Sequence, residues 1–61
     1  MKIEELEVES RWYIKLPGGT ALVEREIVEV TECTVLLRDP RCVVCNAIRY
    51  IFDELVFVEA C

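Results

Sequence analysis

Residues 5–20 read ELEVESRWYIKLPGGT, and two patterns in this segment indicate a β hairpin. Apolar and charged side chains alternate, with Leu6, Val8, Trp12, Ile14 and Leu16 at even positions and Glu5, Glu7, Glu9, Arg11 and Lys15 at odd positions. A period of two predicts a strand with one buried and one solvated face. Ser10, the one polar residue on the apolar side, marks a bend or bulge. Pro17-Gly18 then supplies the preset φ and the positive φ of a tight turn.

The rest of the chain alternates between β-branched runs and breaks. Residues 21–37 are too many for one strand, so we expect Thr31-Glu32-Cys33-Thr34 to turn the chain back. Pro40 cannot donate to a strand ladder and marks a loop, and Asp53-Glu54 is a short polar reversal. The sequence therefore predicts an all-β protein with strands at roughly residues 5–16 (bent), 20–30, 34–38, 47–52 and 55–59. We expect them to form a small five-stranded SH3-like barrel, since closure removes exposed edges. A helix over residues 2–8 is the weaker alternative.

Length and composition predict a single domain over residues 1–61 that functions as an oligomer. A chain this short buries only about 60% of its unfolded surface, yet 54% of its residues are apolar. The surplus outside the core predicts a homo-oligomer. Met1-Lys2-Ile3-Glu4-Glu5 lacks the apolar core of a secretory signal, and no run is long enough to span a membrane. We expect a cytoplasmic protein that does not bind membranes.

The charged residues exclude several classes of function. A net charge of −5 argues against binding to nucleic-acid backbones, which relies on many Lys and Arg side chains. The chain has no His, so a Ser or Cys nucleophile with a His base cannot be assembled. Most of the twelve carboxylates are predicted to point outward into solvent. We therefore expect a binding protein and not an enzyme.

Basic charge is concentrated in residues 33–50, where Arg38, Arg41 and Arg49 face the single acid Asp39. This segment carries +2, so the remainder carries −7. Guanidinium groups bind carboxylates or phosphates in a forked geometry. Trp12 is expected in the core, whereas Tyr13 and Tyr50 could add an aromatic face suited to a flat anion such as a nucleotide. The alternative is that each arginine pairs with one of the protein's own glutamates.

Four cysteines include a C-x-x-C pair, Cys42 and Cys45, which with Cys33 and Cys61 could complete a Cys₄ zinc site. Zinc ribbons carry two such pairs, and here the other two cysteines are single. No helix follows the pair to lower a thiol pKa, as thioredoxin-like chemistry would need. We expect free thiols in a reducing compartment, acting as small buried or interface residues, with no cofactor.

The order of features over about fifty residues resembles the short accessory proteins of bacteriophages that are built on SH3-like barrels. The resemblance rests on residues 12–19 (WYIKLPGG), 29–37 (EVTECTVLL) and 49–59 (RYIFDELVFVE). It implies a viral protein that blocks or sequesters a host component in the host cytoplasm, often as a homo-oligomer. It transfers no binding residue to this sequence.

These observations lead to three functional hypotheses. The first is a non-catalytic binding module that captures a small anionic, nucleotide-like ligand at the arginine-bearing segment, or otherwise blocks a host component, as a homo-oligomer. The second is an inhibitor of a host protein that acts through its acidic strand face or a sheet edge. The third is a structural module stapled by zinc.

Overall fold

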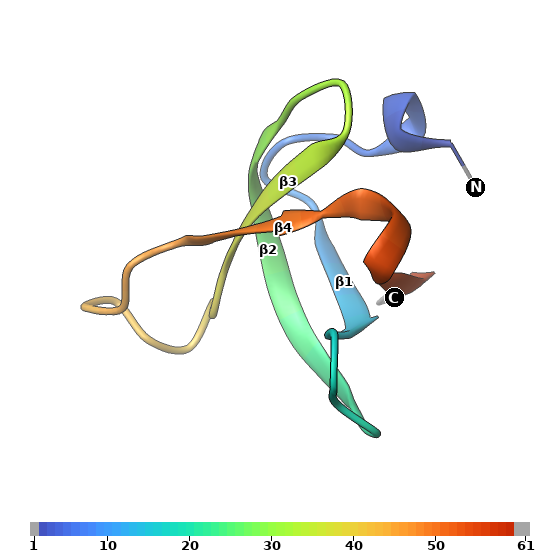
Figure 1. The fold of residues 1–61 in the computed structure, drawn as a ribbon. Helices are drawn as coiled ribbons and strands as arrows, with labels where there is room; N and C mark the ends of the chain where they lie inside the picture. Colours follow the sequence, from blue (N-terminus) through green and yellow to red (C-terminus); the bar gives the residue numbers. More distant parts are fainter. Residues whose placement is uncertain (1, 60–61) are drawn as a thin grey trace.

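The computed structural model, which describes residues 2–59, contains one antiparallel sheet of five strands (Figure 1). The strands are β1 (Arg11–Lys15), β2 (Leu22–Val30), β3 (Thr34–Arg38), β4 (Ile48–Ile51) and β5 (Val56–Glu59). Short 3₁₀ turns, η1 (Ile3–Glu5) and η2 (Phe52–Glu54), are the only helical segments in the described chain. Neither is long and apolar enough to cross a membrane. The all-β class and the five predicted strands are confirmed.

The sheet is open. Its strand order is β4-β3-β2-β1-β5, so β1 pairs with both β2 and β5, while β4 and β5 form the two edges. The predicted closure into a barrel is not confirmed, because no ladder joins β4 to β5 among the described residues. Each of these two strands therefore has one side without a strand partner in the sheet.

The turn between β1 and β2 has the geometry that the sequence predicts. The Gly19 amide donates to the Leu16 carbonyl at 2.9 Å, and Gly18 has a φ of 78°. A type II turn requires this positive φ at its second central position and favours Pro at the first, which is Pro17 here. The turn lies within the six-residue connection between Lys15 and Leu22, which are paired across the hairpin.

The first predicted strand is too long at its start. β1 begins at Arg11, because a turn precedes it in which both the amide and the hydroxyl of Ser10 donate to the Glu7 carbonyl. Glu9 completes this turn with a φ of 74°. The reversal leaves Val8 exposed instead of on the buried face. The predicted bend at Ser10 exists, and the helical alternative for residues 2–8 is realised only as the single turn η1.

The core lies on one face of the sheet. Its buried members come from three strands and two flanking segments and are Leu6, Ile14, Ile27, Val35, Leu37 and Leu55. Trp12 is half-buried against this cluster, and its indole N–H donates to the Ser10 hydroxyl at 3.0 Å. Its ring also meets Phe57 edge to face, with the ring centroids 5.9 Å apart. Trp12, expected in the core, thus lies at its border, with its indole N–H bound to a side-chain hydroxyl.

β2 is the longest strand and carries an irregularity. Ile27 lies opposite Leu37, but Glu29 lies opposite Leu36, so one extra residue, Val28, sits in β2 between them. The predicted turn back into β3 follows at Thr31, whose amide donates to the Thr34 carbonyl at 2.9 Å. The Thr31 hydroxyl accepts the Thr34 amide at 3.1 Å. Side chains thus replace the missing glycine or asparagine as the determinants of this turn.

Candidate ligand site

The three arginines that the sequence groups together do not converge in space. Each pairs with a different glutamate of β2. The pairs are Arg38 with Glu26 at 2.6 Å, Arg49 with Glu29 at 2.9 Å and Arg41 with Glu24 at 3.7 Å between nitrogen and oxygen. The structure therefore gives no common anion site for the three guanidinium groups, and it shows the alternative in which the protein's own acids engage them.

Arg38 is held in place by strand register. It lies directly opposite Glu26 across β2 and β3, and Arg11 lies opposite Glu26 on the other side. The hydrogen bond from Arg38 lowers the pKa of Glu26, and the positive charges of Arg38 and Arg11 add to this effect while burial opposes it. Glu26 thus stays ionised between two cations and holds the Arg38 guanidinium in an ion pair.

Arg49 is engaged in a similar way from the edge strand β4. Arg49 lies opposite Leu36, and Leu36 lies opposite Glu29, so the Arg49 side chain extends across one strand to reach its partner. A second nitrogen of the guanidinium donates to the Thr34 hydroxyl at 3.1 Å. These two contacts, to Thr34 and Glu29, fix the plane of the Arg49 guanidinium and orient it towards β3 and β2.

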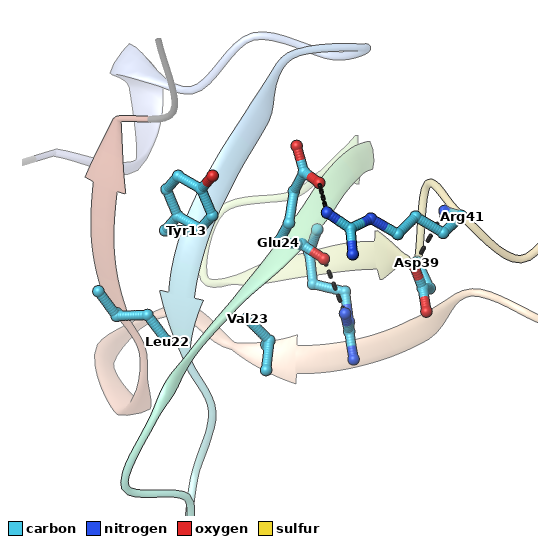
Figure 2. A pocket seen from close by; sticks show the side chains of 7 residues that line it. Tyr13, Leu22, Val23, Glu24, Asp39 and Arg41 are labelled. Carbon is cyan, nitrogen blue, oxygen red and sulfur yellow. Dashed lines mark hydrogen bonds and ion pairs between the residues drawn. The ribbon is translucent and has the colours of Figure 1, made fainter.

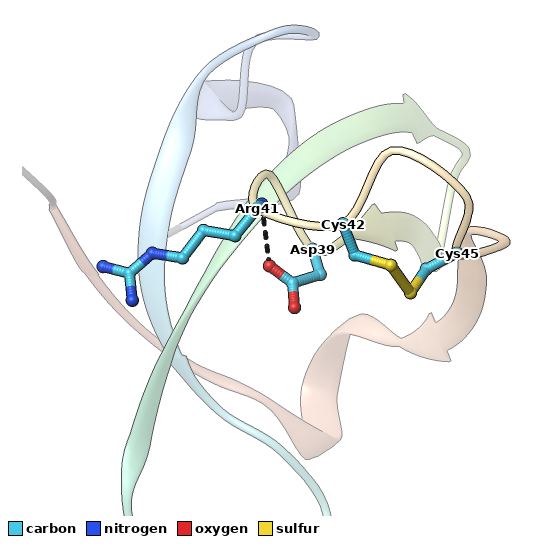
Figure 3. Close-up of a disulfide and its surroundings, with 4 residues drawn as sticks. All are labelled: Asp39, Arg41, Cys42 and Cys45. Carbon is cyan, nitrogen blue, oxygen red and sulfur yellow. Dashed lines mark hydrogen bonds between the residues drawn. A yellow bond between two sulfur atoms is a disulfide. The ribbon is translucent and has the colours of Figure 1, made fainter.

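Arg41 differs from the other two in its freedom. Its side chain is 84% exposed, against 47% for Arg38, and its 3.7 Å approach to Glu24 is too long for a hydrogen bond. Its backbone is well ordered, because the Arg41 amide donates to the Asp39 carboxylate at 2.9 Å (Figure 3). This turn, closed further by the Cys42 amide on the Asp39 carbonyl, anchors the base of the loop that carries Arg41.

A hollow of about 330 Å³ lies beside Arg41 (Figure 2). It exists because β3 ends at Arg38, opposite Glu26, so the first residues of β2 have no β3 partner there. Loop residues from Asp39 onward take the place of that strand. The lining consists of Tyr13, Leu22, Val23, Glu24, Arg25, Asp39 and Arg41. Two cationic and two anionic side chains balance in this lining, and Tyr13 and Leu22 supply apolar surface.

No family model, curated protein or solved structure matches this chain. The candidate site is therefore defined by its geometry alone. Of the five predicted ligand-binding residues, the hollow brings together Tyr13 and Arg41. Arg38 and Arg49 are held by their glutamates, and Tyr50 is half-buried against the core, opposite Val35.

Sequence reasoning missed the contribution of β2 to the site. Leu22, Glu24 and Arg25 line the hollow, although they lie far from the basic segment in sequence. The signal that would have found them is the hairpin register, because Tyr13, at an odd position of the alternating strand, lies directly opposite Glu24. That register depends on the length of the loop after Lys15. The turn residues alone do not set this length.

The cysteines occupy two separate places. Cys42 and Cys45 form a disulfide in the loop after β3 (Figure 3). Cys33 lies exposed on the turn before β3, at the opposite end of that strand. Cys61 lies outside the described residues. Within residues 2–59, no cluster of three or more His, Cys, Asp or Glu side chains could hold a metal ion.

The disulfide differs from the expectation of small buried thiols. The two α-carbons lie 5.4 Å apart, within the range that a disulfide spans, because a turn at Val43-Val44 brings the two cysteines together. Cys45 and Cys33 are exposed, and Cys42 is half-buried. Between the two bonded cysteines, Val43 and Val44 point into solvent with 97% and 87% of their surface exposed. The loop thus presents apolar side chains on a covalently closed ring.

Proposed function

We propose that the protein is a non-catalytic binding module whose ligand site is the hollow between Tyr13 and Arg41. The observation that carries the proposal is the exposed and only loosely paired guanidinium of Arg41, mounted on an anchored loop at the rim of this hollow. A loose surface pair such as Arg41 with Glu24 contributes little, so an incoming anion can replace the glutamate at small cost. The ligand we infer carries a single carboxylate or phosphate beside a flat or apolar part, since the lining charges balance.

The fold supports a binding role of this kind. We propose that the open sheet is a relaxed form of an SH3-like barrel, in which four strands meander and the fifth returns to pair with the first. Such a scaffold places loops at the ends of rigid strands, where binding residues commonly lie. By the resemblance to phage accessory proteins, the ligand would be a host component in the host cytoplasm.

A thermal-shift panel of nucleotides and small carboxylates tests the proposal. A ligand at about 100 times its dissociation constant adds about 2.7 kcal/mol to stability, so a true ligand raises Tm measurably. Arg41→Ala should abolish that shift. Arg49→Ala is the matched control, because it removes the same charge at a position that lies away from the hollow. The proposal fails if no anion moves Tm, or if the two variants lose the shift equally.

A second candidate is an inhibitor of a host protein, favoured by the exposed Val43 and Val44 on the disulfide ring. Adjacent apolar side chains on a closed loop lose little conformational entropy when they enter a partner's pocket. The acidic face of β2 suits this role less well, because its glutamates are paired with arginines. Capture of one defined host protein should be lost in Val43→Ser/Val44→Ser and kept in Val8→Ser. Equal capture by both variants would remove this candidate.

A further inference from the structure

The outer face of the sheet, opposite the core, is apolar towards β5. Tyr13 of β1 lies opposite Val58 of β5, and Lys15 lies opposite Val56. Val56 and Val58 are 55% and 45% exposed, and Tyr13 is exposed to a similar extent. Lys15 is the one charge among these four residues. The other end of this face, over β2, β3 and β4, is covered instead by the pairs of Arg38 and Arg49 with glutamates.

The apolar part of this face continues to a strand edge that has no further strand partner among the described residues. β5 is the last strand in the sheet order, and β1 is its one strand partner in the described chain. Natural edge strands usually carry a charge, a proline or a bulge that blocks further pairing. Glu59 is the one charged residue of β5 and ends the strand, while the preceding segment Val56-Phe57-Val58 has none of these features. At the opposite edge, β4 carries Arg49 in the middle of the strand.

We propose that β5 pairs with β5 of a second copy of this chain, antiparallel and centred on Phe57. A second copy of the chain fits this edge because Val56-Phe57-Val58 is self-complementary and reads the same in both directions. A two-fold axis at Phe57 therefore places valine opposite valine on the outer face and phenylalanine opposite phenylalanine on the inner face. Such a contact is isologous and closes after two copies.

The same register joins the two outer faces. The cross-strand pair of Val56 and Lys15 in one copy then lies beside the pair of Val58 and Tyr13 in the other. One largely apolar strip therefore crosses both copies. The contact is small, which predicts a weak dimer that forms at high protein concentration. Because each copy carries a net charge of −5, added salt should screen their repulsion and strengthen the dimer. Tyr13 belongs both to this strip and to the lining of the hollow beside Arg41, whereas β5 contributes no residue to that lining.

Sedimentation equilibrium between about 10 μM and about 1 mM protein tests the dimer, in the range expected for a small interface. The wild type should dimerise, and Val58→Lys should raise the dissociation constant at least tenfold, by about 1.4 kcal/mol or more. Val8→Lys is the matched control, since Val8 is a similarly exposed valine outside the sheet, and it should dimerise normally. Circular dichroism checks the fold of each variant, and Val56→Lys replaces Val58→Lys if the latter unfolds.

Hydrogen exchange distinguishes strand pairing from any other self-association. The outward amides of β5 should become more protected as the protein concentration rises, whereas the amides of β4 should not change. A protein that stays monomeric at about 1 mM would overturn the proposal. So would a dimer that both lysine variants leave intact.

Discussion

Breaking the Cys42–Cys45 disulfide should destabilise the protein without unfolding it. The bond closes a ring of four residues, for which the chain-entropy relation gives about 1.9 kcal/mol at 25 °C. Loss of native packing adds little, because Val43 and Val44 are exposed and the Asp39 turn that anchors the loop does not involve sulfur. A protein of 61 residues has a total stability of about 3–9 kcal/mol. The sheet should therefore survive reduction.

Thermal unfolding followed by circular dichroism measures this effect, with and without dithiothreitol and in Cys42→Ser/Cys45→Ser. At about 4–8 °C per kcal/mol for a domain of this size, Tm should fall by about 8–15 °C, with the sheet signal at 25 °C unchanged. Cys33→Ser is the control and should melt close to the wild type, because Cys33 is exposed and outside the ring. A reduced protein that is unfolded at 25 °C would refute the reasoning, since the ring would then be required for the fold.

Three further changes probe the core, the turn and the ion pairs. Ile27→Val, at a fully buried site, should lower the free energy of unfolding measured in urea by about 0.5–1.5 kcal/mol. The same change at the half-exposed Ile51 should lower it by less than about 0.5 kcal/mol. Gly18→Ala should lower the free energy of unfolding by about 1–2 kcal/mol in the same assay. The positive φ of Gly18 is the sole cause, since no atom lies close to the added Cβ. The lowered pKa of Glu26 means that its ionised form stabilises the fold above the ordinary value of 4.5, and this contribution is lost as pH falls through the lowered value. Arg38→Gln should raise the Glu26 pKa in an NMR titration.

Local signals in the sequence were enough to predict most of the fold. The alternation around Trp12 and the Pro17-Gly18 turn are short-range features, and the structure places a strand and a turn there. The start of β1 could not be predicted, because the turn before it depends on Glu9 adopting a positive φ. Glutamate is not a residue that marks such turns. The turn is held by the Glu7 carbonyl and by Ile27 from another strand, a contact that local sequence does not reveal.

The site was harder to predict, because it depends on which residues meet across strands. Arg38, Arg41 and Arg49 lie within twelve positions of one another, yet they belong to a strand end, a loop and an edge strand. Arg38 and Arg49 are positioned by glutamates of β2, whose register relative to β3 and β4 is fixed by long-range pairing. The outward direction of Tyr13 was predictable from alternation. That Tyr13 lines the same hollow as Arg41 could not be predicted without knowing where β3 ends.

The extra residue in β2 explains why the outer face divides into a charged part and an apolar part. Ile27 and Val30 both pack in or against the core although they are three residues apart, which an unbroken ladder would not allow. The irregularity at Val28 restores the alternation and keeps Glu29 on the outer face, within reach of Arg49. Without it, Glu29 would face the core as an unpaired acid. One added residue thus lets β2 supply partners to arginines along its whole length, which leaves the β5 end of the sheet as the uncovered apolar surface.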